Sequence, residues 1–162
     1  MNLSVMEERR IVSPVQAIVW GGLICGFMDI TAALLVYGMF GAKPIPLLQG
    51  IAAGILGPRA LSGGLATAAL GLLCHFVVAF LAATVYYAIS RGLPFVLQHA
   101  IPAGAFYGVC VYFFMSRVVV PLSAARKFPF SLKMMIIGIT INIFCVGLPI
   151  ALAARRFSAT TP

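Results

Sequence analysis

Acidic residues are almost absent from this sequence. Its 162 residues include eleven lysines and arginines but only three acids, Glu7, Glu8 and Asp29. Only 9% of the residues are charged, compared with about 25% in ordinary soluble domains, and the mean hydropathy is +1.10. A soluble globule needs a polar surface that this composition cannot supply, whereas lipid covers the outside of a multi-span membrane protein. The sequence therefore predicts an all-α polytopic membrane protein.

The same scarcity excludes several kinds of functional site. A zinc or di-iron centre needs several His, Asp or Glu ligands, whereas the apolar runs hold only Asp29 and His75, with His99 near an expected helix start. The motifs G-x-S-x-G and H-E-x-x-H and a phosphate-binding loop are also missing. We therefore expect no catalytic residue, no metal and no cofactor, and a protein that is not an enzyme.

The net charge of +8 does not indicate nucleic-acid binding either. The basic residues occur singly or in pairs beside apolar runs, where they anchor helix ends and meet anionic headgroups. Their numbers are nearly balanced between the two sides of the expected membrane, so the charge bias does not give the orientation. The arginine pairs beside the first and last runs favour cytoplasmic termini only slightly. The partner that composition predicts is the lipid bilayer.

Four apolar runs are long enough to cross about 30 Å of hydrocarbon, and charge, Pro or Gly bounds each of them. Gly and Pro inside the runs are compatible with membrane helices. They divide the chain into an N-terminal tail (1–14), a single four-helix transmembrane domain (15–156) and a C-terminal tail (157–162). The four expected transmembrane helices are Val15–Phe40, Leu65–Ile89, Ile101–Val120 and Met134–Ala154.

A fifth apolar run, Ile45–Gly57, lies between the first two helices and is too short to span. Its length suits a short interfacial or re-entrant helix, which Pro44 and Pro46 can open. Gly50 and Gly54 lie on one face, together with other small residues, and such a face permits close approach to another helix. An amphipathic connector at the headgroup level and a functional re-entrant element are both compatible with this pattern.

Asp29 stands in the middle of the first expected helix, within the stretch GLICGFMDITAALL. Gly22 and Gly26 precede it at helical spacing and share its face, and Gly71 shares a face with His75 in the second helix. Small residues mark helix–helix contacts in membranes, so we expect Asp29 and His75 to pair inside the bundle. The glycines predicted to line helix contacts are Gly22, Gly26, Gly50, Gly54, Gly71, Gly104 and Gly108.

Asp29 and His75 both lie within ~2–3 Å of the expected midplane, at 1.5 Å rise per residue. Tyr112 and Asn142 fall at the same level in the third and fourth helices, which predicts an intramembrane polar layer of four residues. A lone carboxylate at this depth would be protonated or very costly, and His75 supplies a donor and a compensating charge. The layer either fixes helix register, with hydrogen bonds of ~0.6 kcal/mol, or marks a proton relay or substrate path.

Several stretches resemble a family of small four-helix bacterial inner-membrane proteins. They are ALGLLCHFVVAF, YGVCVYFFMSRVVVPLS and FCVGLPIALAARR, with LLQGIAAGILG before them. The resemblance covers about residues 18–156 and implies four helices and a multi-pass location in the bacterial inner (cytoplasmic) membrane, but no activity. Members of the family often carry a histidine near the position of Asn142, so this chain departs from them there.

The layout is also similar to that of small multidrug-resistance transporters, which have four helices and an essential acid in the first, and work as dimers. This chain is longer and lacks their acidic residue type and its surrounding pattern. Two functions are therefore expected. The first is an accessory or assembly subunit that packs on a membrane partner through small-residue faces. The second is a proton-coupled small-molecule transporter that uses Asp29 and His75 and works as a homo-oligomer.

Overall fold

The computed structural model describes residues 14–124 and 130–158. Every regular element in these two ranges is a helix, so the all-α prediction is confirmed. Four helices are long and apolar enough to cross a membrane, as expected. They cover Pro14–Met39, Gly64–Gly92, Ala100–Leu122 and Leu132–Phe157. Most of the two predicted tails lies outside the described residues.

The first two spans are single α-helices, whereas a π-helical turn interrupts each of the other two. The first span is α1 (Pro14–Met39) and the second is α3 (Gly64–Gly92). The short helix α4 (Phe95–Gln98) joins α3 to the third span. The interrupted spans are α5 (Ala100–Phe114), η2 (Met115–Val119) and α6 (Val120–Leu122), then α7 (Leu132–Ile141), η3 (Asn142–Gly147) and α8 (Leu148–Phe157).

A proline accounts for each π-helical turn. Pro149 has no N–H to donate to the carbonyl of Cys145, four residues earlier. Pro121 likewise has none for the carbonyl of Arg117. Membrane helices accommodate such prolines by local π adjustments that redirect the freed hydrogen bonds. The third and fourth spans therefore each contain a point where the regular α-helical register is broken.

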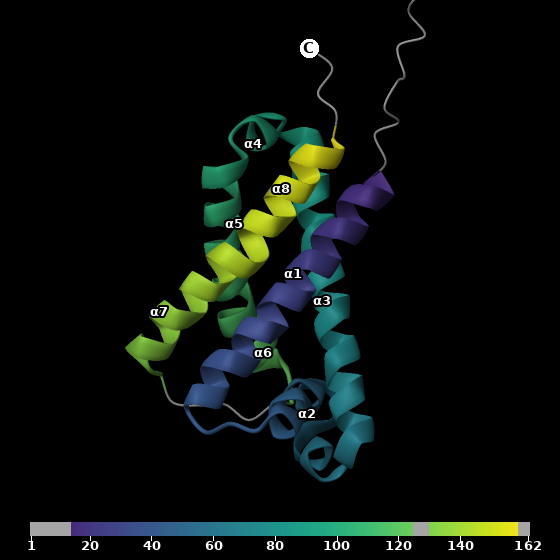
Figure 1. Ribbon diagram of the computed structural model, residues 1–162, viewed down its shortest axis with the longest axis vertical. Helices are drawn as coiled ribbons and strands as arrows, with labels where there is room; N and C mark the ends of the chain where they lie inside the picture. Colours follow the sequence, from purple (N-terminus) through teal and green to yellow (C-terminus); the bar gives the residue numbers. More distant parts are fainter. Residues whose placement is uncertain (1–13, 125–129, 159–162) are drawn as a thin grey trace, which may run out of the picture.

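The connection between α1 and α3 folds into α2 (Pro44–Leu56) followed by the 3₁₀ turn η1 (Gly57–Ser62). Gly41, with φ of 85°, turns the chain after α1, and Gly57, with φ of 65°, ends α2. These positive φ values favour glycine because they cost residues with a Cβ steric strain. A helix is thus present where the short helix was expected, and it packs against α3 at the lower end of the bundle (Figure 1).

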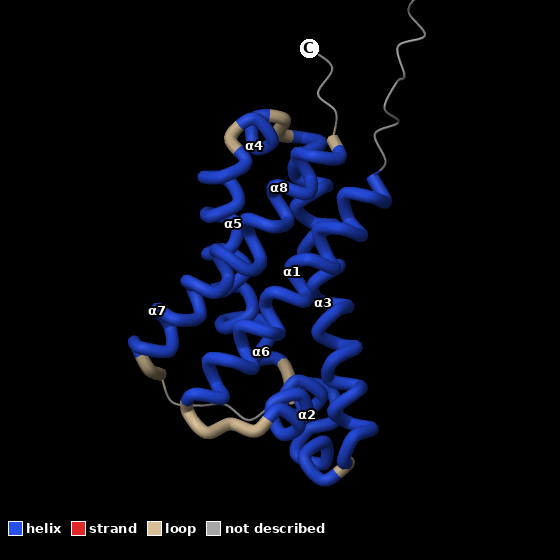
Figure 2. The backbone as a smooth tube through the Cα atoms, viewed as in Figure 1, coloured by secondary structure: helices blue, strands red, loops and turns tan. Residues whose placement is uncertain are grey.

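The four spans form one bundle in which α1 is central. It packs on α3 and on α8, while α5 packs against η3 and α8 (Figure 1). The start of α1 and the end of α8 lie at the upper end of the view, together with α4. The tube in Figure 2 shows the loop after α1 at the opposite end, leading to α2. The two ends of the bundle are therefore closed by different short helices.

The main buried core occupies the upper part of the bundle, and a smaller buried cluster of Ala52, Ala53 and Ala60 lies at the lower end, against α3. The last buried residues before the core ends are Ile30 of α1, Ala79 of α3, Gly108 of α5 and Val146 of η3. Beyond that level, within the described parts of the four spans, burial is confined to the first turns of α3, where α2 packs. We call the two regions the packed half (14–30, 79–92, 100–108 and 146–157) and the loose half (31–39, 64–78, 109–122 and 132–145).

Glycines make the closest contacts between helices. Gly22 and Gly26 of α1 lie against the rings of Phe80 and Phe76 of α3, and a Cβ at Gly26 would be 2.7 Å from the Phe76 ring. Only glycine permits so close an approach at these positions. The same holds for Gly71 against the Leu48 carbonyl, Gly104 against Ala151 and Gly147, and Gly108 against the Asn142 carbonyl, whereas Gly54 is only in ordinary contact with Ser123.

Gly50 does not make the helix contact predicted for it. It is exposed, and no atom lies within 4 Å of the position that its Cβ would occupy. The buried residues of α2 are instead Gln49, Ala52 and Ala53. The Gln49 Nε2 donates to the carbonyl oxygen of Gly64 over 2.9 Å, and this bond directs the Gln49 face of α2 toward α3.

Candidate intramembrane polar site

Asp29 and His75 meet at the boundary between the packed half and the loose half. Asp29 directly precedes Ile30, the last buried residue of α1, and His75 lies one turn before Ala79 on α3. The Nδ1 atom of His75 is 4.0 Å from Oδ2 of Asp29. The Asp29 side chain is 29% exposed and that of His75 12%, so neither is sealed into the core. The structure brings together the two residues expected to pair.

The second nitrogen of His75 determines which proton states the pair can adopt. Nε2 lies 2.9 Å from the carbonyl oxygen of Gly26, and because a carbonyl only accepts, Nε2 carries the proton in this hydrogen bond. In a neutral imidazole Nδ1 would then be an acceptor that faces the carboxylate. A direct bond between Nδ1 and Oδ2 therefore needs one further proton, held either by His75 or by Asp29. If the two side chains were to bond directly, they would share that one proton.

The distance between the two groups leaves room for a change of state. At 4.0 Å, Nδ1 and Oδ2 are in ion-pair range but beyond a hydrogen bond, which requires about 2.7–3.2 Å. A movement of about 1 Å would close the gap and make a charge-assisted hydrogen bond. The short bond to Gly26 holds the imidazole in place, so Asp29 is the partner that has to move.

Gly26 positions His75 in two ways. Its carbonyl accepts the Nε2 hydrogen bond, and its missing side chain makes room for the Phe76 ring. The Phe76 ring in turn lies edge-on to the His75 ring, with centroids 5.6 Å apart, and edge-on to Phe27 at 5.0 Å. These apolar rings lower the local dielectric, which strengthens the interaction between a charged imidazole and a carboxylate.

Tyr112 and Asn142 do not join the pair, which corrects the four-residue layer expected from their depth. The Asn142 amide donates to the carbonyl of Gly138 in its own helix over 3.0 Å. The Tyr112 ring packs on Gly138, where a Cβ would lie 2.5 Å from Cε2. Among the described residues, no hydrogen bond links either of them to Asp29 or His75. Depth alone does not set the direction of a side chain, and the carbonyl of Gly138, one turn earlier in α7, offers the Asn142 amide a closer acceptor.

Three residues near Asp29 were not anticipated from the sequence. Cys25 and Tyr37 of α1 and Cys145 of η3 all interact electrostatically with Asp29, and Tyr37 also interacts with Tyr112. Tyr37 follows Asp29 by two turns on α1, which is the signal that could have identified it. Cys145 lies in the π-helical turn, whose shifted register is not evident from spacing.

Two tyrosines in the packed half have a purely structural arrangement. The Tyr107 hydroxyl donates to the carbonyl of Ala82 over 2.7 Å, and the Tyr86 hydroxyl donates to that of Val96 over 3.3 Å. Their rings pack edge to face, with centroids 5.0 Å apart. Each hydroxyl satisfies a backbone carbonyl next to the core, so these residues hold α3, α4 and α5 together.

Across residues 14–124 and 130–158 no three His, Cys, Asp or Glu side chains lie close enough together to bind a metal ion. The arrangement offers instead one carboxyl group and one imidazole, on facing helices, with an apolar shell and partial access. What these groups can do chemically is bind a proton, share it and release it.

The fold and the site together define a class: an all-helical protein whose four long apolar helices fit a multi-pass membrane protein. Comparison with models of known families, with characterised proteins and with solved structures finds no match to this chain.

Proposed function

We propose that this protein is a proton-coupled transporter of a small molecule, with Asp29 and His75 as its proton site. The observation that carries the proposal is the geometry of His75. Its Nε2 is committed to Gly26, so the imidazole and Asp29 share a single exchangeable proton. Ionisable side chains inside membranes are rare and costly, and they mark proton relays and substrate paths.

The location of the pair supports transport. The helices of the packed half lie on one side of the pair. On the other side the spans have no buried residues except where α3 packs against α2. A transporter needs a site that opens toward one side of the membrane at a time, and rocking of one part of the bundle against another achieves this. The π-helical turns η2 and η3 interrupt the third and fourth spans and supply places where they can bend.

The accessory-subunit expectation loses its main support. It depended on small-residue faces free to pack on a partner, but most of the predicted glycines already pack against helices of the same chain. Gly50 is exposed, and a single exposed glycine is a weak basis for a partner surface. Co-purification of a stoichiometric membrane partner would restore that function as the better one.

We further propose that α2 lies at the headgroup level rather than entering the membrane. Its thirteen residues extend about 20 Å, too little to span. Ile45, Ile55 and Leu56 are exposed on it, and the cations Lys43 and Arg59 flank it. An apolar face between basic ends is typical of an interfacial helix.

The resemblance to small bacterial membrane proteins leads us to assign this transporter to a bacterial inner membrane, where a proton gradient is available to drive it. A homo-oligomer is the assembly we propose, because a bundle of only four spans encloses little space by itself.

The proton site can be tested by nitrogen-15 NMR of histidine in the purified protein. We expect Nε2 of His75 to carry a proton, because it donates to the Gly26 carbonyl, and we expect Asp29→Asn to change the Nδ1 signal, because Nδ1 faces the carboxylate. Thr84→Val is a matched control, because Thr84 lies on the same helix and its hydroxyl bonds only to Phe80 in the helix backbone. An Nδ1 signal that is identical in the wild type and in Asp29→Asn would contradict the shared proton.

Coupling to a substrate needs a second measurement. In weakly buffered solution, small cations, zwitterions and anions are added in turn to the detergent-solubilised protein. We expect one of these classes to displace or recruit a proton in the wild type and in Thr84→Val, but not in Asp29→Asn. Equal proton exchange by Asp29→Asn would exclude the pair as the coupling site.

A further inference from the structure

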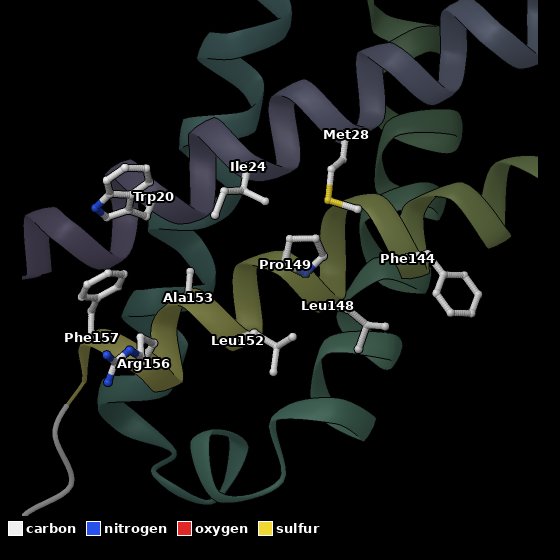
Figure 3. Close-up of a pocket in the computed structure, with 10 residues that line it drawn as sticks. All are labelled: Trp20, Ile24, Met28, Phe144, Leu148, Pro149, Leu152, Ala153, Arg156 and Phe157. Atoms are coloured by element: carbon white, nitrogen blue, oxygen red, sulfur yellow. The ribbon is translucent and has the colours of Figure 1, made fainter.

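A groove runs along the outer face of the packed half, between α1 and the fourth span (Figure 3). Its volume is about 630 Å³. Trp20, Ile24 and Met28 of α1 line one side, and Leu148 and Leu152 of α8 line the other. None of the residues that line it belongs to the Asp29–His75 pair, so this site is independent of the proposed proton site. We call it the α1–α8 groove.

Small residues form the floor of the α1–α8 groove and explain its depth. The two backbones come close at Gly21, where a Cβ would lie 3.5 Å from Ala153 Cβ and 3.7 Å from Ile150 Cα. Pro149 and Ala153 also face the groove and reach only a short way into it (Figure 3). The larger side chains on either side therefore form the walls of the groove, and the small residues form its floor.

One end of the groove is strongly basic. Arg156 lines it, and a second hollow of about 340 Å³, lined by Leu152, Arg155 and Arg156, adjoins it. Asp29 is the only acid among the described residues and lies elsewhere on α1, so no described carboxylate neutralises these two arginines. Trp20 and Phe157 lie at the same end, and aromatic side chains are enriched at the level of the headgroups (Figure 3).

The length of the groove matches one leaflet of a bilayer. From Phe144 to Arg156 the fourth span rises about 18 Å at 1.5 Å per residue, and half of the hydrocarbon thickness is about 15 Å. A chain lying in the groove with its polar end at Arg156 would reach approximately to the bilayer centre. The apolar walls, the basic end and the length are those that a phospholipid needs.

We propose that the α1–α8 groove is a binding site for one anionic phospholipid. The acyl chain lies between α1 and α8 against Ile24, Met28 and Leu152, and the phosphate lies between Arg155 and Arg156. The negative charge of the headgroup supplies the partner that the described chain does not supply to these arginines. The acyl chains of zwitterionic lipids fit the walls equally well, but their headgroups carry no net negative charge to attract the two arginines. The site should therefore select anionic lipids.

The proposal is tested by native mass spectrometry of the full-length, delipidated protein in detergent, titrated with phosphatidylglycerol and with phosphatidylcholine. We expect one phosphatidylglycerol per chain to bind first and more tightly than phosphatidylcholine. Arg155→Gln and Arg156→Gln are each expected to weaken binding about fivefold, and the double variant about twenty-five-fold. Both arginines are exposed, so the variants retain the fold.

Matched controls distinguish a site from general attraction. Arg91→Gln removes a cation from the same end of the bundle but from α3, outside the groove, and should leave binding unchanged. Leu152→Trp should fill the groove and abolish the tight site, whereas Leu81→Trp adds the same bulk at an exposed position of α3 and should not.

Three results would overturn the proposal. The first is equal binding of phosphatidylglycerol and phosphatidylcholine, and the second is a loss in Arg91→Gln as large as that in Arg156→Gln. The third is a dimer that forms through the groove, recognised because Leu152→Trp dissociates it while lipid stays unbound. In that case a second copy of the chain is the occupant.

Discussion

The packed half and the loose half of this bundle have nearly the same apolar composition but very different packing. In the packed half, glycines bring backbones together and tyrosine hydroxyls bond to carbonyls of neighbouring helices. In the loose half, Tyr112 packs on Gly138 and the hydroxyl of Thr140 bonds to its own helix. Lipid is as apolar as leucine, so apolar side chains alone do not hold membrane helices together. Close backbone approach and hydrogen bonds between helices make the difference.

The largest effect is expected from a methyl group at one of the close backbone contacts of the packed half. Gly108→Ala would place its Cβ 2.5 Å from the Asn142 carbonyl oxygen, and backbone cannot yield as a side chain can. We expect the free energy of unfolding in detergent to fall by about 2–3 kcal/mol. Gly38→Ala, in the loose half, meets no atom within 4 Å and should stabilise α1 by up to about 1 kcal/mol. Equal losses in the two variants would contradict the distinction between the halves.

The next largest effect concerns α2, which packs against the loose half. Gln49→Leu removes the donor to the Gly64 carbonyl and should lower the free energy of unfolding by about 1–2 kcal/mol. Gly50→Ala is the neighbouring control, since its Cβ enters open space, and like Gly38→Ala it should stabilise its helix by up to about 1 kcal/mol rather than destabilise it. If Gln49→Leu also causes no loss of stability, α2 does not hold this end together.

Removing one hydroxyl from each half compares them directly. Tyr107→Phe loses the 2.7 Å bond to Ala82 and should cost about 0.6–1.5 kcal/mol of unfolding free energy. For Tyr112→Phe, which has no described hydroxyl bond, we expect a change within about 0.5 kcal/mol. Thermal unfolding of the two variants in the same detergent measures the difference. A larger loss in Tyr112→Phe would mean that the loose half closes in the membrane.

The smallest effect is expected at the boundary itself. A double-mutant cycle with Asp29→Asn and His75→Gln should give a coupling of about 0.5 kcal/mol, because the two groups are separated by 4.0 Å and partly exposed. A cycle with Asp29→Asn and Thr84→Val should be additive. Coupling above about 2 kcal/mol would indicate a tight structural pair and weaken the transport proposal.

The helical spans could be predicted because hydrophobic length determines them, and the short helix after the first span because Pro and Gly bound it. It could also be inferred that Asp29 and His75 point toward each other, since each shares a helix face with glycines, and glycines on a membrane helix mark a contact with a neighbouring helix. Both inferences depend on the regular α-helical period, which α1 and α3 keep throughout.

The prediction that Tyr112 and Asn142 join the layer was wrong, and for Asn142 the regular α-helical period is interrupted at that point. Asn142 begins a π-helical turn, so its direction no longer follows from spacing, and its amide finds an acceptor in its own helix. Gly50 was selected because it is small, but the orientation of α2 is set by Gln49, the one polar side chain able to bond across to α3. A buried hydrogen bond therefore determines which face of α2 packs on α3, rather than the stripe of small residues.

The π-helical turn of the fourth span also shifts the phase of the helix by one residue. Each residue of an α-helix turns it by about 100°, so the extra residue rotates α7 by that angle relative to a straight continuation of α8. The face that α8 buries through Ile150, Ala151 and Ala154 is therefore directed differently along α7. Deleting one residue between 142 and 147 would bring the two faces back into line. The set of α7 side chains that faces the bundle is thus fixed by the number of residues in one turn, and a single-codon deletion would change that set while leaving every side chain of α7 the same.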